Sequence, residues 1–153
     1  MDEEGETSIV ASFAKNSRET ICVGISYWQG KQRLFVRLYA QTPEAQQPVP
    51  TKEGVTLPVE QYPALLEGVR ALAGAGGEEI VTAKIDKNKS QQVWVGANIY
   101  KDIPLLYIRT YLAFGGSQEL KPAKQGVSIR AELYPKLLEA VEKLGQALNK
   151  NLS

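Results

Sequence analysis

Hydrophobic and polar residues alternate along several stretches of the chain and then change to a helical spacing. Residues 21–28 and 34–39 alternate between aliphatic and other side chains with a period of two, which is typical of strands with one buried face. Residues 9–14 and 55–57 indicate one strand before these two and a short one after them. From Leu65 to Leu72 the apolar residues follow one stripe of an amphipathic helix. The pattern therefore predicts a β-β-β-β-α unit.

The whole pattern occurs twice, at an offset of 72 positions. The stretch KEGVTLPVEQYPALLEGV begins at Lys52, and KQGVSIRAELYPKLLEAV begins at Lys124. Further upstream, Arg37 corresponds to Arg109, and the segment SIVASFAKN aligns with EIVTAKIDKN if a one-residue gap is allowed. The chain is therefore predicted to contain a tandem repeat of one small unit.

The repeat predicts an α+β organisation with four parts. These are an acidic disordered tail at 1–7, a first β-β-β-β-α unit at 8–73, a Gly-rich linker at 74–78 and a second unit at 79–153. One helix on one sheet of about 70 residues buries little apolar surface, so neither unit is expected to be stable alone. We expect the two units to pack as an intramolecular pseudo-dimer.

Composition argues against several classes of protein. Cys22 is the only cysteine and histidine is absent, which excludes disulfide frameworks, zinc fingers and histidine general bases. The sequence has no paired nucleophile and base, no glycine-rich phosphate loop and no carboxylate cluster at ligand spacing. We therefore expect no enzyme activity, no metal site and no cofactor. An acidic N-terminus and the lack of a long apolar run predict an intracellular protein without membrane contact.

The net charge of +1 is small for a protein that depends on phosphate attraction alone. Residues 1–6 hold four acidic residues and no base, so the remainder carries 18 basic against 13 acidic residues, a net charge of +5. This balance permits a nucleic-acid ligand without requiring one.

The strand faces opposite the aliphatic ones combine aromatic side chains with arginine. Alternation places Trp28, Phe35, Arg37 and Tyr39 on this face in the first unit, and Trp94, Tyr100, Tyr107, Arg109 and Tyr111 in the second. Single-stranded nucleic acid binds to such faces, because bases stack on rings while guanidinium groups contact phosphates. The alternative is a second buried layer with arginines paired at its rim.

Two predicted hairpin tips carry basic residues beside an aromatic one. The stretch WQGKQR places Lys31 and Arg33 near Trp28, and YKDIP places Lys101 next to Tyr100. A lysine at a hairpin tip is usually only solvated. Its presence beside a ring in both copies favours the nucleic-acid interpretation.

The motifs YIRTY, LKP, KQGVSI and AELYPKLL, together with FVRLY, TKEGVTL and VEQYPALL in the first copy, resemble a known family. They are similar to the single-strand-binding domain of the transcriptional coactivator family named positive cofactor four. The resemblance implies two curved antiparallel sheets, each backed by a C-terminal helix. It also implies a dimeric surface that binds single-stranded or melted DNA. Plant Whirly proteins share a similar plan.

The resemblance implies specific roles for residues of this chain. Trp28 and Tyr100 would stack on bases, and Arg37 and Arg109 would contact phosphates. The basic residues of the hairpin tips and of the fourth strands would add phosphate contacts, and these are Lys31, Arg33, Lys101, Lys52, Lys121 and Lys124. Ser26, Asn98, Glu53 and Gln125 replace residues that are often basic in the family, which predicts weaker binding.

Two functions of different classes follow. The first is a single-stranded DNA-binding cofactor of transcription or replication, with RNA left open as the ligand. The alternative is a protein-interaction module of a transcription or replication complex with weak or lost nucleic-acid binding. The expected compartment is the cytoplasm or nucleoid in a prokaryote, and the nucleus or an organelle in a eukaryote.

Overall fold

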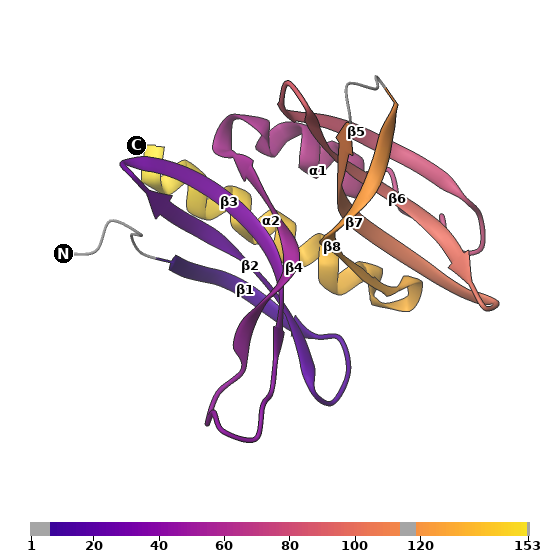
Figure 1. Cartoon of the computed structure of the whole chain (residues 1–153), viewed down its shortest axis with the longest axis horizontal. Coiled ribbons are helices and arrows are strands. Elements are labelled where there is room, and N and C mark those ends of the chain that lie inside the picture. Colours follow the sequence, from indigo (N-terminus) through magenta and orange to yellow (C-terminus); the bar gives the residue numbers. More distant parts are fainter. Residues whose placement is uncertain (1–6, 114–118, 153) are drawn as a thin grey trace.

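The computed structural model describes residues 7–113 and 119–152, without the side chains at 28 and 150–152. The first unit contains β1 (Thr7–Ala14), β2 (Glu19–Trp28), β3 (Lys31–Ala40), β4 (Val49–Pro58), a short η1 (Val59–Gln61) and α1 (Tyr62–Arg70). The second contains β5 (Ile80–Asn88), β6 (Gln91–Tyr100), β7 (Ile103–Ala113), β8 (Leu120–Arg130), η2 (Ala131–Leu133) and α2 (Tyr134–Leu152). The predicted β-β-β-β-α plan is confirmed in both units (Figure 1).

Each unit forms one antiparallel sheet with its strands in sequence order, β1-β2-β3-β4 and β5-β6-β7-β8. Ladder pairs repeat at an offset of 72: Ile9 lies opposite Gly24, and Val81 lies opposite Gly96. The offset therefore holds through the first strand as well, and the one-residue gap in the sequence alignment was wrong. Thr7 pairs with Ser26, so it begins β1 rather than ending the predicted tail, whose other residues lie outside the described part.

The fourth strand is longer than residues 55–57 suggested, because a bulge lets it continue. Arg37 lies opposite Gly54, whereas Tyr39 lies opposite Pro50, so three residues of β4 face one residue of β3. The second unit repeats this irregularity between β7 and β8. The bulge interrupts the alternation that reveals a strand in sequence and bends the sheet where it occurs.

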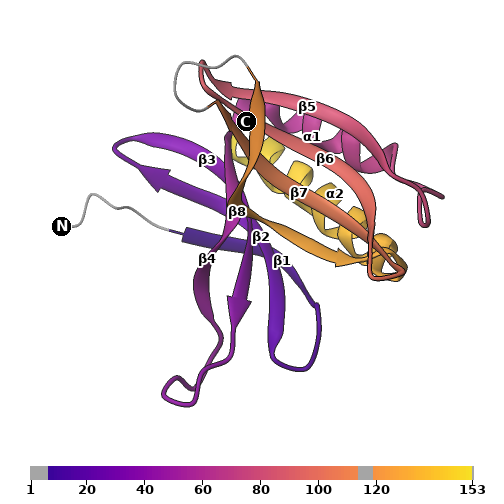
Figure 2. The same cartoon turned by 45° about the vertical axis from the view of Figure 1, so that its right-hand side comes forward.

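The two helices are exchanged between the units. Helix α1 packs mainly against β5 and β6, and α2 packs against β1 and β2 (Figures 1 and 2). Leu65 and Val69 of α1 and Leu144 of α2 are completely buried. The resemblance implies that each helix backs its own sheet, and the structure differs on this point. The observed exchange places residues of both units in a single apolar core, which explains why neither unit needs to be stable alone.

Hydrogen bonds between the helices follow the internal symmetry in their donors but not in their acceptors, because Val141 is related to Val69 and not to Arg70. The Tyr62 hydroxyl donates to the carbonyl of Val141 at 2.7 Å, and the Tyr134 hydroxyl donates to the carbonyl of Arg70 at 3.3 Å. Tyr62 and Tyr134 begin the two helices and are each followed by the proline that the sequence placed there. The intramolecular pseudo-dimer is confirmed, and related tyrosines at the two helix starts donate to the opposite helix.

The predicted Gly-rich linker forms a series of turns after α1. Gly74 and Gly77 have φ values of 77° and 101°, a backbone conformation that is strained for residues with a Cβ atom and therefore favours glycine. Ala75 between them is buried in the shared core. The linker thus contributes to packing in addition to joining the units.

Within the described residues, neither helix combines the length and apolarity needed to cross a bilayer.

The shared core predicts that both units unfold together. Replacing Leu65 by Ala should lower the free energy of unfolding by about 2–5 kcal/mol, because it leaves a cavity between α1 and the second sheet. The measurement is urea denaturation followed by fluorescence in two backgrounds, Trp94→Phe to report from the first unit and Trp28→Phe to report from the second. The urea midpoints reported by the two tryptophans should fall to the same lower value. A lower midpoint for one tryptophan alone would contradict the shared core.

Candidate nucleic-acid interface

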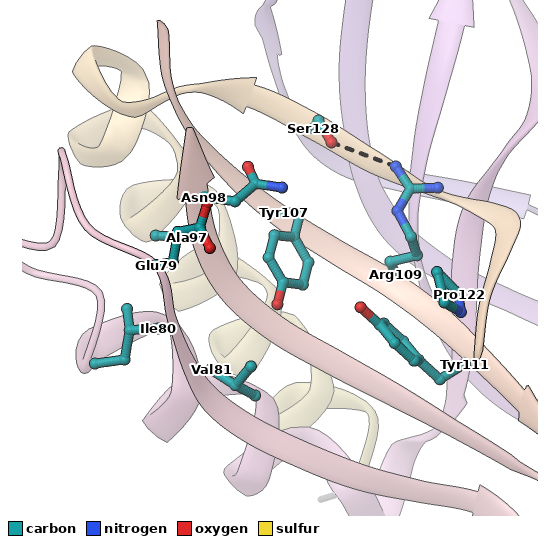
Figure 3. Close-up of a pocket in the computed structure, with 10 residues that line it drawn as sticks. All are labelled: Glu79, Ile80, Val81, Ala97, Asn98, Tyr107, Arg109, Tyr111, Pro122 and Ser128. Carbon is teal, nitrogen blue, oxygen red and sulfur yellow. Dashed lines mark hydrogen bonds between the residues drawn. The ribbon is translucent and has the colours of Figure 1, made fainter. Parts of the chain in front are cut away.

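The outer face of each sheet, opposite the helices, carries a groove. The groove of the second unit has a volume of about 520 Å³ (Figure 3), and that of the first about 250 Å³. Their common lining consists of Thr7, Ser26, Phe35, Arg37, Tyr39, Pro50 and Thr56 in the first unit and Glu79, Asn98, Tyr107, Arg109, Tyr111, Pro122 and Ser128 in the second. Every pair differs by 72 positions. The grooves are therefore two copies of one site that have diverged in sequence.

An aromatic ring crosses β2 or β6 at the floor of each groove. A Cβ atom on Gly24 would lie 2.7 Å from the ζ-carbon of Phe35, and one on Gly96 would lie 2.5 Å from the hydroxyl of Tyr107. These glycines leave room for the rings, which are only 3% and 9% exposed. The sequence correctly placed Phe35 and Tyr107 on this face, but the rings are buried and do not form an open stacking surface.

The second groove is the more polar of the two. Burial raises the pKa of Tyr107 to about 12, with a further contribution from the neighbouring Tyr111 hydroxyl, so its phenol stays neutral at physiological pH. The Asn98 Oδ1 atom is buried and has no hydrogen-bond partner within the described residues. A buried acceptor without a partner is rare in proteins, and here a ligand with N–H or O–H groups would satisfy it.

The two arginines brace the bulges of the fourth strands. Arg37 donates from Nη1 to the carbonyl of Thr51 at 2.9 Å. Arg109 donates from Nη1 to the carbonyls of Ala123 at 3.1 Å and Lys124 at 3.4 Å, and from Nη2 to Ser128 Oγ at 3.3 Å (Figure 3). Both side chains are half-buried, and each guanidinium keeps further N–H donors for a ligand in the groove.

Trp94 occupies the position related to Cys22 and is covered on two sides. Its ring stacks on Tyr111 with centroids 3.7 Å apart, and Lys84 Nζ lies 4.3 Å from the centroid. Tyr111 and Lys84 approach from β7 and β5, the two neighbours of β6. Tyr111 of this pair lines the groove, and Trp94 does not offer a free face to a base.

Tyr100 provides the exposed ring that the sequence predicted. It is 59% exposed at the end of β6, and Lys101 Nζ lies 5.3 Å from its ring centroid. The hairpin turn that follows contains two residues with positive φ, Lys101 and Asp102. The structure describes the backbone of Trp28, opposite Lys31 in the ladder, but the predicted role of its side chain falls outside the described residues.

The remaining predicted residues do not line the two grooves. Arg33 is half-buried on β3, and the exposed lysines are Lys31, Lys52, Lys121 and Lys124. The ion pairs within the described part of the chain involve none of them. They remain available to an anionic ligand, although the structure does not bring them into one cluster.

Several groove residues were not among the predicted site residues, notably Asn98, Tyr111, Thr56 and Ser128. Alternation along the strands could have found them, because residues two positions apart share a strand face. Tyr111 lies two residues from Arg109, and Asn98 lies two residues from Tyr100. Thr56 and Ser128 likewise lie two residues after the repeated glycines Gly54 and Gly126. In the described residues, no group of cysteine and acidic side chains is arranged to hold a metal ion.

The fold and the grooves define a duplicated β-β-β-β-α protein with two open sheet faces. Residues 15–68 match the family Transcriptional Coactivator p15 (PC4). Two crystal structures of a PC4 homolog from Burkholderia pseudomallei, one tetragonal and one orthorhombic, are similar to 48% of the chain at 20% identity with a TM-score of 0.38. The similarity covers 98% and 92% of those chains. No curated protein matches the chain.

The bulge contacts predict unequal structural roles for the two arginines. Arg109→Ala should lower the free energy of unfolding by about 1–3 kcal/mol, because several acceptors lose a charged donor. Arg37→Ala removes one such contact and should cost less. Urea denaturation of both variants measures the difference, and equal losses would contradict the asymmetry of the hydrogen bonds.

Proposed function

We propose that the protein binds single-stranded nucleic acid, with DNA as the principal ligand, across the outer faces of its two sheets. It would act inside the cell, without enzyme activity, as a cofactor of transcription or replication. The observation that carries the proposal is the pair of related grooves, each with an arginine beside a tyrosine. The match of residues 15–68 to a transcriptional coactivator family supports it.

The chemistry of the grooves suits an unpaired strand better than a duplex. A single strand presents base faces, base edges and phosphates together, whereas a duplex buries the base faces. Tyr100 offers an exposed ring for stacking, and Asn98 offers an unpaired acceptor for a base edge. The free N–H groups of Arg37 and Arg109 are suited to backbone phosphates.

The burial of the aromatic rings in the groove floors also limits how a ligand can bind. Since Phe35 and Tyr107 are buried, stacking is restricted to rings at the hairpin ends and groove rims. We therefore propose that contacts with phosphates and base edges dominate in the grooves, while stacking contributes at Tyr100 and Trp28. RNA would fit the same features, and parallel titrations with DNA and RNA of one sequence would distinguish the two ligands.

A second candidate is a protein-interaction module with weak nucleic-acid binding. Glu79 lines the second groove, and a carboxylate there opposes an anionic strand. The small net charge agrees with this alternative. If the protein is an interaction module, its affinity for DNA would be low and would not depend on the residues that line the grooves.

The exposed ring provides the test. Tyr100→Ala should weaken binding of a labelled oligothymidine by about 1–3 kcal/mol, since one stacked base loses its platform. Tyr100→Phe should bind like the unmodified protein because the ring is kept. Fluorescence anisotropy measures both affinities, together with that for a duplex of equal length, which should bind more weakly.

Tyr27→Ala is the matched control for the removal of a tyrosine. Tyr27 is also exposed near a hairpin, but it lies on the opposite strand face and contacts Gln32. This variant should keep full affinity. Equal losses in Tyr27→Ala and Tyr100→Ala, or equal affinity for duplex and single strand, would contradict the proposed function.

A further inference from the structure

A cleft of about 250 Å³ lies at the boundary between the two units. Arg37 and Thr56 line it from the first unit, and Lys87, Gln91, Thr110 and Gln125 line it from the second. Arg37 and Thr56 also line the groove of the first unit, so the cleft and that groove are adjacent. No aspartate or glutamate is among the described residues that line the cleft.

The charges around the cleft are positive and uncompensated. Lys87 is half-buried, and the ion pairs among the described residues do not include it. Burial lowers the pKa of Lys87, and the positive charges of Arg33 and Arg37 lower it further. Three cations held close together without a carboxylate oppose folding unless an anion joins them.

A buried hydroxyl in the cleft also has no partner. Thr110 is 3% exposed, and its Oγ1 atom makes no hydrogen bond with the described residues. A hydroxyl removed from water without a partner carries a desolvation cost. In the cleft it could donate to an oxygen of a bound anion.

The pseudo-two-fold relation provides an internal comparison. The positions related to Lys87, Gln91, Thr110 and Gln125 are Lys15, Glu19, Leu38 and Glu53. At these related positions the lysine pairs with a carboxylate, since Lys15 Nζ lies 3.9 Å from Glu19 Oε1. The apolar Leu38 stands where the second unit has Thr110. Arg33 likewise corresponds to Leu105. The features that favour an anion therefore occur together at this boundary and not at the positions related to it by the repeat.

We propose that this cleft is a phosphate-binding site in which Lys87, Arg37 and Thr110 hold a tetrahedral oxyanion. Arg37 keeps free N–H donors beyond its bond to Thr51, Lys87 supplies a compact charge, and Thr110 supplies a hydroxyl donor. The phosphate could belong to a free anion or to a nucleic-acid backbone. The second source rests on the proposed function, because a strand in the adjacent groove would then place one phosphate at this boundary.

The first experiment uses inorganic phosphate as the probe. Amide chemical shifts are followed by NMR during a phosphate titration at constant ionic strength, for the unmodified protein, Lys87→Gln and the matched control Lys15→Gln. Shifts should centre on residues 87, 91 and 110. Lys87→Gln should weaken phosphate binding about tenfold or more, while Lys15→Gln should leave it unchanged. Equal effects of the two variants, or shifts centred elsewhere, would overturn the site.

Thr110→Val separates a binding role from a structural one. It removes the unpaired hydroxyl and keeps the shape of the side chain, so the melting temperature should stay the same or rise. Phosphate affinity should nevertheless fall. A folded Thr110→Val variant that binds phosphate like the unmodified protein would remove Thr110 from the site.

A second titration identifies the source of the phosphate. The salt dependence of oligothymidine binding is measured for the same variants. If the cleft holds a backbone phosphate, Lys87→Gln should reduce the magnitude of the slope of log K against log salt concentration by about 0.7, and Lys15→Gln should leave that slope unchanged. An unchanged slope, with phosphate binding lost in the NMR titration, assigns the site to a free anion. A protein that binds phosphate but no oligothymidine would refute the proposed function and leave the site standing.

Discussion

The exchange of helices between two half-sized units is the constraint on which the rest of the structure depends. Each sheet has one aliphatic face, and the helix that covers it comes mainly from the other unit. Burial of Leu65 and Val69 on one side and Leu144 on the other joins the two layers into one core. Since apolar burial is the main favourable term in folding, the units stabilise each other and their relative position is determined.

The same arrangement leaves the outer faces of both sheets without a covering helix. Glycines at positions 24 and 96 admit the rings of Phe35 and Tyr107, and the bulges of the fourth strands are held by Arg37 and Arg109. These features hollow each face in the same place. Duplication within one chain also allows the two halves to diverge, which a homodimer cannot do. The polar lining of the second groove and the unpaired lysine at the unit boundary are products of that divergence.

Much of the fold could be predicted because its signals are local and occur twice. Alternating aliphatic residues marked the strands, helical spacing after Pro63 and Pro135 marked the helices, and the constant offset indicated the pseudo-dimer. The helix exchange could not be predicted, since an amphipathic stripe shows that a helix is covered but not which sheet covers it. The start of β4 was missed because the bulge interrupts the alternation.

The candidate site was predictable only in part. Alternation placed the aromatic residues on the correct face, but it cannot distinguish an exposed ring from one lying over a glycine of the neighbouring strand. Tyr100 and Phe35 illustrate the two outcomes. The unit boundary depends on how the sheets meet, so Lys87 and Thr110 carried no visible signal although both lie within the repeat.

The measurement that most directly tests the account is a map of amide shifts during a titration of the full chain with oligothymidine. Perturbed amides should lie along the outer faces, on β2, β3, β6 and β7 around the two grooves, while α1 and α2 should change little. Perturbation centred on the helices, or scattered without relation to either groove, would contradict the claim that a single strand binds across these outer faces.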